Sequence, residues 1–109
     1  MKTNVIIDGD ACPVVNSVIE LTKGTGIFVT VLRSFSHFSH QIQPEHLKTV
    51  YVDDGPDAVD YKIVQLAKKE DIVITQDYGL ASLLIHKVHI VMHHKGSIYR
   101  ADNIQALLD

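Results

Sequence analysis

With 109 residues and an ordinary apolar content of 46%, the chain suits one globular domain over residues 1–109 and is too short for two. The net charge of −3 argues against a general affinity for nucleic acid, which is typical of strongly basic surfaces. The chain has one cysteine, which excludes an internal disulfide framework. It has no apolar run close to the roughly 18 residues needed to span a bilayer, so we expect a cytoplasmic protein.

Strand-like and helix-like segments alternate along the chain. The first apolar run predicts a strand over 4–7, and residues 1–3 lead into it without a signal peptide. In chain order there follow a predicted helix over 13–23, strands over 27–32 and 48–52, a helix from the 53–56 turn to the lysines at 68–69, a strand over 72–75, a helix over 80–87, a strand over 89–92 and a helix over 103–108. The strands are nearly continuous apolar runs, which favours parallel strands buried on both faces. We therefore predict a three-layer α/β/α fold with a mainly parallel sheet of about five strands.

Acidic residues follow two of the predicted strands. Asp8 and Asp10 come after the first strand, where Gly9 should turn the chain, and Asp77 comes after the strand over 72–75. If these two strands are neighbours in a parallel sheet, their carboxyl ends line one crevice, and we expect the three aspartates to share it. Asp10 has an alternative interpretation, in which it caps the helix that Pro13 should open.

The helix after the 53–56 turn carries a further candidate. Asp53, Asp54 and Asp57 are most simply interpreted as acids that favour a helix N-terminus. Asp60 comes too late for a cap and falls at the rim between the apolar stripe and solvent. It is therefore the candidate of this group for chemistry.

Asp8, Asp10, Asp60 and Asp77 form the predicted catalytic group. Gathered carboxylates without cysteine or a close histidine pair suit oxygen-loving Mg²⁺ or Mn²⁺ better than Zn²⁺. Without a cation they would repel one another and raise one another's pKa. With one, they could activate water for displacement at phosphorus, as metal-dependent nucleases and phosphatases do.

Two further pairs of residues are candidates for substrate binding. His37 and His40 lie in a predicted loop with two phenylalanines, a mixture that could stack an unpaired base and contact a phosphate. Surface histidine without a role is the simpler interpretation there. Thr75 and Gln76 could orient a metal-bound water beside Asp77, although Thr75 can equally just end the strand.

Four segments resemble the YaiI/YqxD family of bacterial proteins of unknown function, whose domain looks like a variant of the PIN nuclease-like fold. They are 7–14 (IDGDACPV), 58–64 (AVDYKIV), 71–81 (DIVITQDYGLA) and 96–99 (GSIY) before 103–104. In PIN-like nucleases, acids after the first strand, within a middle helix and after a later strand hold a divalent metal. The resemblance implies Asp8, Asp60 and Asp77 as metal ligands, with Asp10 as a fourth acid. We expect single-stranded RNA as the substrate, because so small a fold offers no basic surface broad enough to hold a duplex, while the loop with His37 and His40 could stack an unpaired base.

The resemblance also bears on the end of the chain. Family members usually continue past the last helix into a basic segment, whereas this chain stops at 107–109, so it is expected to lack that arm or to be a fragment. If the arm grips nucleic acid, this form should bind it poorly.

Two other functions remain open. A haloacid-dehalogenase-like phosphatase also has Asp-x-Asp after its first strand, but it prefers Thr or Val where this chain has Cys12, and it needs room for a cap. A non-catalytic module would instead bind RNA or a partner protein through the loop at 34–40. Metal titration separates the readings, because only the enzymes need a divalent cation in the acidic crevice.

Overall fold

The computed structural model describes residues 3–10, 12–35, 43–55 and 57–108. Within these residues five parallel strands form one sheet in the order β3-β2-β1-β4-β5. The strands are β1 (Asn4–Asp8), β2 (Phe28–Ser34), β3 (Leu47–Val52), β4 (Ile72–Ile74) and β5 (Ile90–Met92), and the helices are α1 (Val15–Thr22), α2 (Ala58–Leu66), α3 (Tyr78–Leu84) and α4 (Ala101–Leu108). The predicted parallel sheet of about five strands is confirmed.

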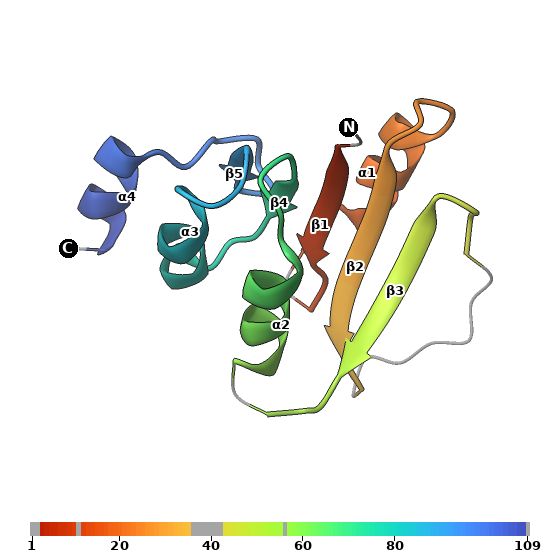
Figure 1. The fold of residues 1–109 in the computed structure, drawn as a ribbon, viewed down its shortest axis with the longest axis horizontal. Coiled ribbons are helices and arrows are strands. Elements are labelled where there is room, and N and C mark those ends of the chain that lie inside the picture. The colour runs from red at the N-terminus through yellow and green to blue at the C-terminus, as the bar shows by residue number, and fades with distance from the viewer. Residues whose placement is uncertain (1–2, 11, 36–42, 56, 109) are drawn as a thin grey trace.

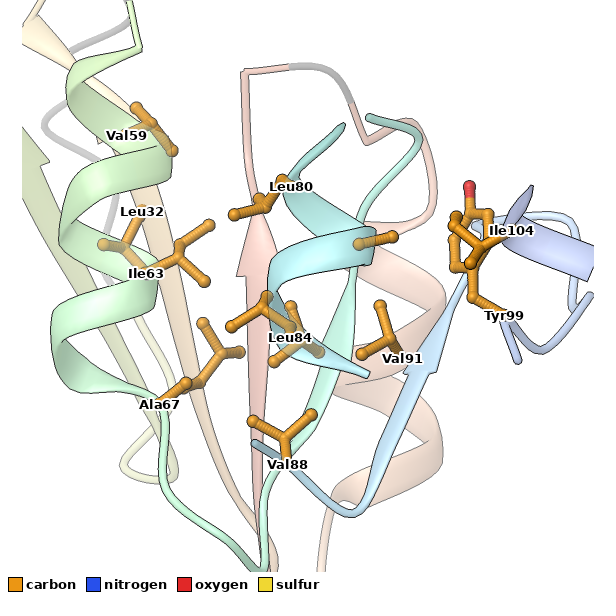
Figure 2. Close-up of a cluster of buried hydrophobic side chains, with 13 residues drawn as sticks. Leu32, Val59, Ile63, Ala67, Leu80, Leu84, Val88, Val91, Tyr99 and Ile104 are labelled. Carbon is orange, nitrogen blue, oxygen red and sulfur yellow. The ribbon is translucent and has the colours of Figure 1, made fainter. Parts of the chain in front are cut away.

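Helices cover both faces of the sheet, with α2 and α3 on one face and α1 on the other (Figure 1). Side chains alternate along a strand, so the central strand β1 sends Val5 and Ile7 into the cluster with α1 and Ile6 into the cluster with the other helices. Figure 2 shows the cluster between the sheet and the two helices α2 and α3, which includes Ile63 of α2 and Leu84 of α3. This arrangement confirms the three-layer α/β/α fold, and it explains why the strands are apolar at nearly every position.

The helix boundaries differ from those predicted by one to three residues at several ends, including the end of α3 at Leu84 and the start of α4 at Ala101. Helix α1 begins at Val15, two residues after Pro13, and its N-cap residue makes no side-chain cap hydrogen bond. Helix α2 ends at Leu66, before the two lysines that were expected to close it. Helix α3 begins at Tyr78, two residues earlier than expected, because the Asp77 side chain caps it.

The sheet order reverses direction between β1 and β4. From β1 the chain builds outward through β2 and β3, and α2 then carries it back to β4 on the other side of β1. The predicted adjacency of the first and fourth strands is thus confirmed, with Ile7 paired to Ile74. In parallel α/β sheets the carboxyl ends at such a reversal form a binding crevice. No helix among the described residues combines the length and apolar character needed to cross a membrane.

Candidate metal and phosphate site

The site lies at the carboxyl ends of β1 and β4. Asp8 is the last residue of β1, and it lies on the same side of the strand as Ile6, which faces α2 and α3. Its side chain is buried, with 7% of its surface exposed. The Thr75 hydroxyl, one residue after β4, donates a hydrogen bond to Asp8 Oδ2 over 3.1 Å. The pairing of β1 with β4 therefore fixes the first carboxylate of the site.

Thr75 also positions the residue two places further on. Its Oγ1 accepts a hydrogen bond from the backbone N–H of Asp77 over 3.0 Å, while it donates to Asp8. A continuous chain of hydrogen bonds thus runs from the Asp77 backbone through the Thr75 hydroxyl to Asp8. Thr75 is buried, with 1% of its surface exposed, so its hydroxyl does not face solvent. It connects Asp8 to Asp77 instead.

Asp77 is the N-cap of α3, a structural role in addition to its predicted place among the acids of the site. Its Oδ1 accepts a hydrogen bond from the backbone N–H of Leu80 over 3.0 Å. The cap satisfies one of the donors that a helix leaves open at its N-terminus. It also holds one oxygen of Asp77 in a fixed place at the edge of the sheet. The signal was present in the sequence, because Asp is a favoured N-cap directly before a helical run.

Asp60 reaches the same place from α2. The pKa of its carboxyl is raised to about 7, and burial is the largest cause. The negative charges of Asp77 and Asp8, a hydrogen bond with Asp77 and the charge of Asp57 raise it further. Burial is also the main cause that raises the pKa of Asp8, opposed by the hydrogen bond from Thr75 and reinforced by Asp10 and Asp77. The three predicted acids therefore influence one another electrostatically across the boundary between the sheet and α2.

These side chains border a cleft of about 320 Å³. The acids that line it are Asp8, Asp10, Asp54, Asp57, Asp60 and Asp77. Asp54 and Asp57 were interpreted from the sequence only as acids that favour the start of a helix. Asp57 does occupy the N-cap position of α2, with a left-handed φ of 61°, but its side chain makes no cap hydrogen bond. The rule that places functional residues at the carboxyl edge of the sheet applies to both, because they lie in the segment that joins the end of β3 to α2.

Asp10 lines the cleft but does not cap α1. Both of its carboxylate oxygens accept from the backbone N–H of Ser34, over 3.1 and 3.2 Å, so it joins the turn after β1 to the end of β2. The turn itself depends on Gly9. A Cβ there would lie 2.8 Å from the Leu32 carbonyl oxygen and 2.5 Å from Val31 Cγ1, which are impossible contacts. The alternative interpretation of Asp10 as a helix cap is thus wrong, because the capping position belongs to Val14.

The oxygen donors around the cleft suit Mg²⁺ or Mn²⁺ by type. In the part of the chain that the structure describes, however, no three His, Cys, Asp or Glu side chains are placed to hold a metal ion together. The common coordination sphere expected for Asp8, Asp60 and Asp77 is therefore not preformed, although all three line the cleft. Repulsion among carboxylates opposes their closer approach until a proton or a cation neutralises them.

The remaining substrate-binding candidates lie elsewhere. The Gln76 side-chain carbonyl pairs with His94 Nε2 over 3.2 Å, and Gln76 is not among the residues that line the cleft. His93, which directly follows β5, packs against His94 with ring centroids 4.2 Å apart and ring planes tilted by 33°. His37 and His40 lie outside the described residues, so their predicted contacts with a base or phosphate stay predictions.

Comparison with known proteins identifies close relatives. A family model described as "Uncharacterized BCR, YaiI/YqxD family" matches residues 6–109. A UPF0178 protein of Staphylococcus epidermidis is 86% identical over 109 residues, which are 100% of this chain and 73% of the relative. UPF0178 proteins of Staphylococcus haemolyticus and Staphylococcus aureus are 76% and 74% identical, covering 97% and 98% of this chain and 72% and 70% of the relatives. No solved structure gives a significant match.

Proposed function

This chain belongs to the YaiI/YqxD family, and we propose that its acidic cleft hydrolyses phosphodiester bonds of single-stranded RNA with the help of Mg²⁺ or Mn²⁺. The observation that carries the proposal is the electrostatic crowding of Asp60. An acid whose pKa rises to about 7 beside two other carboxylates marks a place where a divalent cation would be strongly stabilised. Such crowding is otherwise unfavourable for a folded protein.

Asp8, Asp60 and Asp77 are the proposed ligands, since each contributes carboxylate oxygen to the same cleft. When bound, a divalent cation would lower the pKa of a water molecule and offset negative charge on the phosphate. The chain's own part is to hold the acids in place. The Thr75 hydroxyl fixes Oδ2 of Asp8, and the N–H of Leu80 fixes Oδ1 of Asp77, so each acid keeps a second oxygen for another partner.

Asp60 differs from these two acids in its place in the fold, because it lies in the first turn of a helix and not after a strand. Helix α2 connects β3 to β4 and packs on one face of the sheet, and the Asp60 carboxyl shares a hydrogen bond with Asp77. Loss of its proton would have to accompany cation binding, because a ligand carboxylate must be ionised. Affinity for Mg²⁺ is therefore expected to rise with pH through about 7.

The test is cleavage of a 5′-labelled single-stranded RNA in Mn²⁺, in Mg²⁺ and in EDTA. We expect slow cleavage with either metal, none in EDTA, and a shallow dependence on salt because few cationic side chains are available to neutralise phosphates. Asp77→Asn should lose several orders of magnitude in rate. Its matched control is Asp102→Asn, which changes an exposed aspartate of α4 that pairs with Arg100 away from the cleft.

Two outcomes would overturn the proposal. Equal cleavage by the wild type and by Asp77→Asn would point to a contaminating nuclease. If no cleavage is seen and the protein binds RNA equally well with and without EDTA, the function would instead be that of a non-catalytic RNA-binding module. A thermal-shift series with Mn²⁺, Mg²⁺ and Ca²⁺ adds a measurement that does not depend on the choice of substrate, because any bound cation should raise the melting temperature.

A further inference from the structure

An apolar groove continues from the acidic cleft between α2 and α3. It encloses about 420 Å³, and three of the residues that line it, Asp57, Asp60 and Asp77, also line the cleft. The two hollows therefore adjoin at these three side chains. The other side of the groove is formed by apolar side chains, among them Tyr61, Val64, Leu80 and Leu83.

The groove has a gradient of polarity that follows from helical spacing. On α2 the lining residues recur at 57, 60, 61 and 64, which is one face of a helix. On α3 they are the cap Asp77 and then Leu80 and Leu83. In both helices the acids come at the N-terminal end, next to the cleft, and the apolar residues come one or two turns further along. A ligand lying in the groove would thus meet charge at one end and apolar surface at the other.

The apolar end has a buried floor and exposed walls. Leu80 is 2% exposed and belongs to the core between α2, α3 and the sheet, as Figure 2 shows. Tyr61 on one wall is 75% exposed, and Leu83 on the other is 65% exposed. Large apolar side chains facing each other across an open groove gain free energy when a flat apolar group covers them.

We infer that this groove holds one unpaired nucleobase of the RNA whose phosphate occupies the acidic cleft. The inference rests on the proposed function. The three side chains that the two hollows share support it, because the base and the phosphate of one nucleotide are covalently joined and need adjoining places of opposite character. Stacking on Tyr61 does not depend on base identity, since every base has a π face, so the subsite should tolerate all four bases.

The test compares two small probes in Mg²⁺, adenosine 5′-monophosphate and ribose 5-phosphate, of which the second carries a hydroxyl in place of the base. Both are titrated into the full chain and followed by NMR of the leucine and valine methyl groups. We expect the nucleotide to bind about tenfold more tightly, with the methyl signals of Leu83 and Val64 shifting. Tyr61→Ala and Leu83→Ala should each reduce that preference to less than about threefold, and Tyr61→Phe should keep it.

Leu21→Ala is the matched control, because Leu21 is 79% exposed on α1, on the other face of the sheet, and its removal should leave the preference unchanged. Equal binding of the two probes by the wild type overturns the inference, as does a preference that survives Tyr61→Ala. A wild type that is a dimer in solution and becomes monomeric with Tyr61→Ala also overturns it, because the groove would then be an interface between copies.

The RNA cleavage assay separates this inference from the proposed function. If metal-dependent cleavage occurs but the KM values of Tyr61→Ala and the control Leu21→Ala are equal, the nuclease proposal stands and the inferred base subsite is wrong. If Tyr61→Ala raises KM about tenfold with kcat within about twofold of the wild type, both stand. If the base preference is present and requires Tyr61 but no cleavage is seen, the groove binds a nucleotide and the hydrolytic function is wrong.

Discussion

Thr75 Oγ1 lies 3.1 Å from Asp8 Oδ2, and this hydrogen bond connects two residues that are 67 positions apart in the sequence. Both residues are buried, so the bond is shielded from water. It ties the carboxyl end of β1 to that of β4 at the point where the sheet order reverses. The acidic cleft therefore depends on a neutral hydroxyl as well as on its aspartates.

Replacing Thr75 by Val should destabilise the protein by about 1–3 kcal/mol, because the substitution keeps the shape but leaves the Asp8 carboxyl and the Asp77 N–H without their partner. Thr75→Ser retains the hydroxyl and is the control, with an expected loss of about 1 kcal/mol or less for the missing methyl group. Urea denaturation measures both. A Val variant as stable as the Ser variant would show that the hydrogen bonds contribute nothing.

Stability of the metal-free protein should fall as the pH rises from about 4 to about 8. The pKa of Asp60 is about 7 in the folded chain against an ordinary 3.8, so folding favours the protonated form. The resulting stabilisation is complete below pH 3.8 and is lost as the pH rises through about 7. Burial raises the pKa of Asp8 as well, which acts in the same direction.

Asp60→Asn is the control for this pH dependence. It stays neutral at every pH, so its melting temperature in EDTA should fall less between pH 5.5 and pH 8 than that of the wild type. Identical slopes for the two proteins would show that Asp60 titrates normally and that the carboxylates do not crowd one another.

Asp77→Asn and Asp77→Ala should separate the capping role of Asp77 from its charge. Asn also accepts a hydrogen bond at an N-cap, so Asp77→Asn should melt at a higher temperature than the wild type without metal, through relief of repulsion, while losing stabilisation by Mn²⁺. Asp77→Ala loses the cap and should be less stable than Asp77→Asn by about 1 kcal/mol. An Asn variant that melts lower than the wild type and still responds to Mn²⁺ would assign Asp77 a structural role only.

Gly9→Ala should be strongly destabilising although Gly9 is not at a positive φ. Its added Cβ would lie 2.8 Å from the Leu32 carbonyl oxygen, a backbone atom that cannot move without disturbing the pairing of β1 with β2. We expect a loss of about 1–3 kcal/mol, as for other overpacked sites. Gly55→Ala is the control, since a Cβ there meets nothing within 4 Å. Similar melting temperatures for the two variants would contradict the close approach.

The sequence by itself determined the alternation of strands and helices, the parallel sheet and the position of Asp8 and Asp77 at one edge of it. These follow from apolar runs and from the rule that carboxyl ends of parallel strands share an edge, which need only local information. The family assignment also came from contiguous motifs and is confirmed. The likeness to PIN nucleases and the roles of the individual acids stay predictions.

Only the tertiary structure decided which partner each acid has. It pairs Asp8 with Thr75 and Asp10 with Ser34, and it brings Asp57 into the cleft. It also opened the groove beside Tyr61. These relationships depend on the register between strands far apart in the chain and on the rotation of α2 and α3 over the sheet. Both are set by how the core side chains pack together, and no local pattern of residues encodes them.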